Sequence, residues 1–149
     1  MVVKQGNCVL INGISCFQCR VRKNSLYTVD GVAYDIHEEN LIAQLLLRMD
    51  IPFFHHLMIK FNYGTKEEPQ ERLWCPDFIF TKPYRWIGTP CNSSVIIGIE
   101  AKRRHIKGKA MNKSRVLCDE YAIPILILNG DNLDTYFRNG VLPLQRLAS

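Results

Sequence analysis

Apolar and polar residues alternate over the first quarter of the chain, which predicts a small β-meander over residues 8–35. Two turn signals, Asn12-Gly13 and Asp30-Gly31, each lie between short apolar or β-branched runs. Both dipeptides suit two-residue hairpin turns, because both central positions of such turns need positive φ. The segment is too short to be an independent domain. We therefore expect it to extend a larger domain.

The apolar pattern changes to a helical period after residue 35. Asp35 and Glu38 have the spacing of a capping box, which marks the start of a helix. Pro52 marks its end. The apolar stripe of this amphipathic helix consists of Leu41, Ile42, Leu45, Leu46 and Met49.

Three strands, a helix, a further strand and a short helix are predicted over the rest of the chain. The compact apolar run that begins at Val95 predicts a strand buried on both faces, and Asn129-Gly130 closes a later buried strand. We expect strands and helices over residues 53–63 (strand), 73–81 (strand), 95–102 (strand), 109–121 (helix), 124–128 (strand) and 133–137 (helix), with loops at 64–71 and 83–94.

This order predicts one α/β domain over residues 1–149, with an α-β-β-β-α-β core whose mixed sheet is flanked by helices. Residues 1–36 form a β-rich extension, residues 37–130 the core and residues 131–149 a C-terminal tail. A chain of this length has room for one core, and 47% hydrophobic with 22% charged residues excludes disorder, collagen and coiled coil.

The longest stretch without a charged residue, residues 5–19, is too short and too polar to span a bilayer. The N-terminus also lacks the basic start and long apolar stretch of a signal peptide. We therefore expect a cytoplasmic protein without a membrane partner.

Charge is unevenly distributed along the chain, whose net charge is +5. Residues 1–29 contain basic but no acidic residues, and so do residues 101–118. Two such segments indicate a protein that binds a polyanion, and they favour nucleic acid. The alternative for each segment is a solvated basic face.

The chemical motif of the chain is Pro76-Asp77 followed by Glu100-Ala101-Lys102. Glu100 and Lys102 are two apart on a predicted strand and therefore share a face. Pairing with the strand that carries Asp77 would bring two carboxylates and an ammonium together. Mg²⁺ prefers carboxylate and other oxygen ligands, and a bound cation neutralises a phosphodiester and activates water. We expect Asp77, Glu100 and the backbone carbonyl of Ala101 to bind Mg²⁺, and Lys102 to stabilise developing charge.

Residues 72–80 and 97–104, which carry this motif, resemble the PD-(D/E)XK nuclease superfamily, whose members have the restriction-endonuclease-like fold. The order of elements over residues 37–130 agrees with that core. The resemblance implies that Asp77, Glu100 and Lys102 are catalytic, that Mn²⁺ substitutes for Mg²⁺, and that Glu38 or Glu39 completes the site. Helix capping also explains Glu38.

The whole chain is similar to the small cyanobacterial homing endonucleases of this fold that group I introns encode. This narrower resemblance implies a homo-oligomer that cuts a long, two-fold-symmetric site in double-stranded DNA. A restriction endonuclease and a Holliday-junction resolvase are the nearest alternatives. A non-catalytic DNA-binding module is the alternative from another class, and it predicts no loss on changing Glu100.

Three segments are candidates for DNA contacts. The N-terminal hairpins have the size of a ribbon that enters a major groove, and their polar residues are Gln18, Arg20, Arg22, Lys23 and Asn24. The loop over residues 82–92 carries Lys82, Arg85 and Trp86, although a packed Trp86 anchoring a surface loop explains it equally well. The segment after the motif supplies phosphate contacts from Arg103, Arg104, Lys107 and Lys109.

Two further pairs have metal-ligand chemistry. Cys16 and Cys19 could form half of a zinc site, but no second pair completes it, so we expect no structural zinc. His55 and His56 are adjacent on a predicted strand, where successive side chains point to opposite faces. We therefore expect core or surface histidines that do not share an ion.

Overall fold

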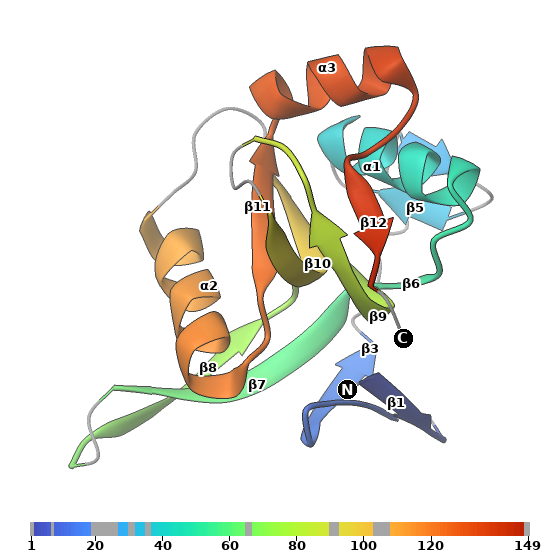
Figure 1. The fold of residues 1–149 in the computed structure, drawn as a ribbon. Coiled ribbons are helices and arrows are strands. Elements are labelled where there is room, and N and C mark those ends of the chain that lie inside the picture. The colour runs from blue at the N-terminus through green and yellow to red at the C-terminus, as the bar shows by residue number, and fades with distance from the viewer. Residues whose placement is uncertain are drawn as a thin grey trace.

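The computed structural model describes residues 2–6, 8–18, 27–29, 32–34, 37–64, 67–89, 93–102 and 108–147. These residues form a mixed α/β fold (Figure 1). The elements in chain order are β1 (Val2–Gln5), β2 (Cys8–Ile11), β3 (Ile14–Gln18), β4 (Tyr27–Val29), β5 (Val32–Tyr34), α1 (His37–Arg48), β6 (Phe53–His55), β7 (Leu57–Gly64), β8 (Pro69–Trp74), β9 (Phe78–Trp86), β10 (Ser94–Lys102), α2 (Gly108–Tyr121), β11 (Ile125–Asn129), α3 (Gly130–Asn139) and β12 (Leu144–Arg146).

The central sheet has the strand order β11-β10-β9, and β6 and β12 pair with different parts of β9. Only the β10–β11 pair is parallel among the described pairs, and α2 connects its two strands. The central sheet is therefore a mixed sheet with a helical crossover, as the sequence predicts.

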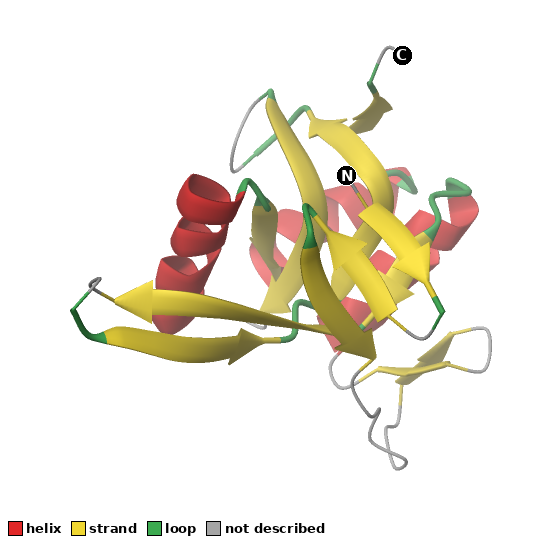
Figure 2. Ribbon diagram, turned by 90° about the horizontal axis from the view of Figure 1, so that it is seen from below, coloured by secondary structure: helices red, strands yellow, loops and turns green. Residues whose placement is uncertain are grey.

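A second sheet has the order β1-β2-β3-β7-β8, and all its pairs are antiparallel. The β7–β8 hairpin passes beneath α2 and projects beyond it (Figure 1 and Figure 2). Tyr121 at the end of α2 anchors the hairpin, because its hydroxyl accepts from the N–H of Asn62 at 2.9 Å and donates to its carbonyl at 3.1 Å. The sheet that begins in the N-terminal segment thus includes residues beyond position 36.

Opposite faces of the central sheet bury two hydrophobic clusters. Leu45 and Leu46 of α1 and Leu133 of α3 pack on one face, against Phe80 and other strand residues. Leu117 of α2 packs on the other face with residues of the second sheet, and Ile79 joins this cluster. The central sheet is therefore the middle layer between two apolar clusters. Polar groups can lie at the ends of its strands.

Local sequence signals explain several of these elements. Asn12 and Gly13 have φ angles of 49° and 84°, as expected of the hairpin turn between β2 and β3. Leu41, Ile42, Leu45 and Leu46 of the predicted apolar stripe are buried in α1, whereas Met49 is half-buried and follows the end of the helix. The predicted α2 and β11 are also present, with ends that differ from the prediction by at most one residue.

The three strands predicted between the two helices are instead five in the described part of the chain, β6 to β10. The expected strand over residues 73–81 is divided between β8 and β9 by residues 75–77, and β8 begins inside the expected loop at 64–71. Residues 53–63 form two strands in different sheets, separated at His56, whose φ is 55°.

The expected loop at 83–94 is instead entered by β9, which continues through Pro83 to Trp86. Pro83 is tolerated because it lies between the parts of β9 that pair with β6 and β12, and beside a register shift in β10.

Within the described residues, the structure contains no helix that is both long and apolar enough to cross a membrane.

Gly98 permits the close approach of β9 and β10 at this register shift. A Cβ atom there would meet the backbone oxygen of Phe78, and it would lie 2.9 Å from Ile125 Cδ1 and 3.0 Å from Ile79 Cδ1. The close approach of the two backbones therefore explains the glycine at this position.

We predict that Gly98→Ala destabilises the fold by about 1–3 kcal/mol, because the added methyl group overpacks the strand pair. Urea unfolding measures the change. Val95→Ala on the exposed side of the same strand is the control and should cost less than about 1 kcal/mol. Equal stability of Gly98→Ala and wild type would contradict this account of the strand contact.

Candidate active site

Two hydrogen bonds hold Asp77 and Glu100 together, because each carboxylate accepts a backbone N–H from the chain segment that carries the other. The N–H of Asp77 donates to Glu100 Oε2 at 3.1 Å, and the N–H of Ala101 donates to Asp77 Oδ2 at 2.7 Å. Asp77 lies in the bend before β9, and Glu100 lies near the end of β10. Both residues are buried. The predicted convergence of these two carboxylates is therefore present.

Lys102 lies on the same face of β10 as Glu100. Its Nζ is 3.4 Å from Glu100 Oε1, and its side chain is 30% exposed, whereas that of Glu100 is 9% exposed. The ammonium therefore borders the buried carboxylates and also reaches solvent. Ala101 contributes its N–H to Asp77, and ligation by its carbonyl oxygen stays a prediction.

Glu39 supplies the third carboxylate. It lies in the first turn of α1 and is 3% exposed, and it hydrogen-bonds with Asp77. The helix N-terminus favours its negative charge. Glu38 is only half-buried. Of the two glutamates that the sequence offers, the structure brings Glu39 to the cluster.

Close packing of three carboxylates disfavours their ionised forms. Burial raises the pKa of Asp77 well above its ordinary value, and hydrogen bonding to Glu39 and the charge of Glu100 raise it further. Burial also raises the pKa of Glu100 to about 7, although Lys102 opposes this shift. A cation bound among these groups would relieve their repulsion, so the donor set fits a hard divalent ion.

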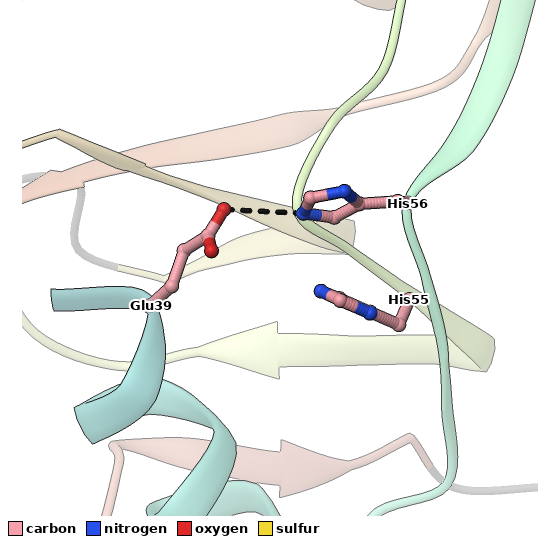
Figure 3. Close-up of side chains that lie close together, drawn as sticks. All are labelled: Glu39, His55 and His56. Carbon is pink, nitrogen blue, oxygen red and sulfur yellow. Dashed lines mark hydrogen bonds and ion pairs between the residues drawn. The ribbon is translucent and has the colours of Figure 1, made fainter. Parts of the chain in front are cut away.

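His55 and His56 lie beside this carboxylate cluster, a position that the sequence pattern did not predict. Nε2 of His56 lies 3.2 Å from Glu39 Oε1 and 3.6 Å from Asp77 Oδ1. The rings of His55 and His56 lie side by side, with centroids 3.9 Å apart (Figure 3). The expectation that they point to opposite faces is wrong, because the positive φ of His56 interrupts strand alternation.

Burial and the neighbouring His56 together lower the pKa of His55 to about 4, against the opposing charge of Glu39. His55 is therefore neutral near pH 7. No sequence signal marks the kink, because neither glycine nor proline occupies position 56.

The structure describes the side chains of only some of the candidate DNA contacts. Lys82 is exposed on β9, and Arg85 is half-buried with its Nη1 3.4 Å from Ser93 Oγ. Gln18 ends β3 and Lys109 lies in α2, but their side chains fall outside the described part. The remaining candidates lie wholly outside the described residues: Arg20, Arg22, Lys23, Asn24, Arg103, Arg104 and Lys107.

The prediction that Trp86 contacts DNA is wrong. Its side chain is 0% exposed, and its Nε1 donates to the carbonyl of Thr89 at 3.2 Å. Tyr136 of α3 packs edge-on against the indole ring. Trp86 is therefore the anchor of the following loop, which is the alternative that the sequence left open.

Cys16 is buried within the second sheet. Burial raises the pKa of its thiol to about 11, so the thiol stays protonated near neutral pH. Cys19, its partner in the hypothetical half-site for zinc, lies outside the described residues.

Comparison of the chain with family models, with curated proteins and with solved structures found no match.

We predict that Glu100→Gln stabilises the cation-free protein above pH 7. Between about pH 4.5 and 7 the folded chain retains a proton on Glu100 that the unfolded chain has lost, so stability falls as pH rises. The full effect is about 3 kcal/mol at most. Glutamine does not titrate, so the free energy of unfolding of the variant should lack this contribution to the decline with rising pH.

Urea unfolding with a chelator present, at about pH 5 and about pH 8, measures this effect. Glu71→Gln is the control, because Glu71 is exposed and pairs with Lys60 on the β7–β8 hairpin. A Glu100→Gln protein no more stable than wild type at the higher pH would contradict the charge account.

Proposed function

We propose that this protein is a divalent-cation-dependent endonuclease that hydrolyses phosphodiester bonds in double-stranded DNA. The arrangement of Asp77, Glu100 and Lys102 carries the proposal. The buried Glu100 carboxylate accepts from the N–H of Asp77, and the buried Asp77 carboxylate accepts from the N–H of Ala101. An ammonium that reaches solvent lies 3.4 Å from Glu100. Glu39 adds a third carboxylate from a different element.

The fold supports this proposal. The strand order β6-β9-β10-β11, with β10 and β11 parallel and the other pairs antiparallel, is compatible with a restriction-endonuclease-like core. The helix α1, which precedes these strands, and the helix α2, which connects β10 to β11, pack on opposite faces. The PD-(D/E)XK resemblance of the motif thus agrees with the positions of its residues.

The donor set fits Mg²⁺, with Asp77 and Glu100 as ligands and Glu39 in reach of Asp77. The bound ion would neutralise the phosphate and acidify a water molecule. Lys102 stabilises the negative charge that develops at phosphorus, because its ammonium is fixed beside Glu100 and open to solvent. The N–H groups of Asp77 and Ala101 orient the two carboxylates.

The basic segments support DNA as the substrate. Residues 101–118 contain seven basic and no acidic residues, directly after the site. Such a segment neutralises backbone phosphates and places the duplex without reading its sequence. We propose that the N-terminal segment supplies base contacts and that a second copy of the chain cuts the other strand.

A non-catalytic DNA-binding module accounts less well for the site. Three carboxylates beside one another in a buried cluster repel a phosphate and cost folding energy. Binding alone gains nothing from them, whereas metal-dependent hydrolysis needs them.

We predict that Lys102→Ala lowers the rate of DNA cleavage by about 100-fold or more, comparable with the loss of one charge-stabilising donor in other enzymes. DNA affinity should fall by less than tenfold, since this is one cation among many. Cleavage of a mixed DNA pool with Mg²⁺ and a binding assay with Ca²⁺ measure the two effects.

Lys60→Ala is the matched control, because Lys60 is an exposed lysine that pairs with Glu71 away from the motif. It should cleave like wild type. Undiminished cleavage by Lys102→Ala would overturn the assignment of the site.

A further inference from the structure

One carboxylate and two imidazoles converge beside the proposed nuclease site (Figure 3). Glu39 comes from the first turn of α1, His55 ends β6, and His56 forms the link to β7. One ligand atom from each residue lies within 4.8 Å of the other two. Glu39 and His56 are buried, and His55 is half-buried.

We propose that Glu39, His55 and His56 form a second cation site that takes a first-row transition-metal dication, Zn²⁺ foremost, in preference to Mg²⁺. The inference goes beyond the proposed function, because the nuclease proposal assigns no role to the two histidines, although the second site shares Glu39 with it.

The backbone conformation at His56 creates this convergence. In a regular strand, adjacent side chains point to opposite faces. The φ of 55° at His56 is a left-handed conformation that costs about 1–2 kcal/mol for a residue with a side chain. The N–H of His56 donates to the carbonyl of Asp77 at 3.2 Å, which holds the kink in register with the nuclease motif.

The spacing of the donors suits one ion. Two donors bound to a tetrahedral zinc ion lie about 3.4 Å apart, given bond lengths of about 2.0–2.2 Å. His56 Nε2 and Glu39 Oε1 are already 3.2 Å apart. The remaining separations, at most 4.8 Å, close by small rotations of the side chains.

The chemistry of the donors selects the ion. Mg²⁺ prefers oxygen ligands and sheds water reluctantly, whereas imidazole nitrogens favour zinc and its neighbours in the transition series. Two imidazoles and a carboxylate leave one position of a tetrahedral ion open. Asp77 Oδ1, 3.6 Å from His56 Nε2, is close enough to contribute there.

Zinc binding to the full chain, stripped of metal with a chelator, tests the proposal directly. Competition against a chromogenic chelator in excess Mg²⁺ should give a site for Zn²⁺ that Mg²⁺ does not displace. Co²⁺ in its place should give visible absorption bands of nitrogen and oxygen ligation, without an intense sulfur-to-metal band. Zn²⁺ should also raise the melting temperature of wild type, since it binds only the folded arrangement.

His56→Gln and Glu39→Gln should each weaken this site by about 100-fold or more, since loss of even an outer-shell partner costs about 10–100-fold. His37→Gln is the control, because His37 is exposed at the start of the same helix, and it should bind Zn²⁺ like wild type. Failure of wild type to bind Zn²⁺ in excess Mg²⁺, or undiminished binding by a folded His56→Gln protein, would overturn the proposal. The wild-type measurement decides if the variants do not fold.

Lys102→Ala separates this inference from the nuclease proposal. It should retain the Zn²⁺ site while losing DNA cleavage, because Lys102 contacts Glu100 and its ammonium is no metal ligand. Wild type that binds Zn²⁺ but never cleaves DNA would overturn the nuclease function alone. Wild type that cleaves DNA with Mg²⁺ but has no Zn²⁺ site would overturn the second site alone.

Discussion

The two hydrogen bonds that tie the Asp77 and Glu100 carboxylates to the backbone of Ala101 and Asp77 are the interaction on which the arrangement of the site depends. Each carboxylate accepts a backbone N–H from the strand region that carries the other. These bonds fix the bend before β9 against the end of β10, where Gly98 allows the two backbones to approach. The same bend supplies the carbonyl that accepts from His56. Strand pairing, the position of the acids and the kink that brings in the histidines are therefore one mechanical unit.

The buried carboxylates of this unit lack sufficient positive charge nearby. Glu39, Asp77 and Glu100 are buried together, and the raised pKa values of Asp77 and Glu100 reflect the cost of ionising them there. Lys102 offsets part of that cost from the solvent side. Folded proteins keep such clusters where function needs them, and both the proposed nuclease chemistry and the proposed second cation site supply the positive charge that the cluster lacks.

Periodicity in the sequence predicted the parts of this arrangement that depend on local pattern. The strand that carries Glu100 and Lys102 is a short apolar run, and their spacing of two placed them on one face. Asp77 joined them because neighbouring strands pair. The continuation of β9 through Pro83 was not predictable from local pattern, because it depends on gaps in the pairing of three other strands. The kink at His56 was missed for the same reason, since a contact with a distant carbonyl holds it.

Sequencing of the DNA ends that the protein generates is the most direct test of the account. Wild type and Glu100→Gln would each be incubated with Mg²⁺ and a pool of bacterial genomic fragments and cruciform DNA. The account predicts new ends from wild type that are absent with Glu100→Gln, recurring at one sequence motif if the enzyme is site-specific and at the branch point if it is a resolvase. If no DNA end depends on Glu100, this would contradict the central claim that hydrolysis depends on the buried carboxylates.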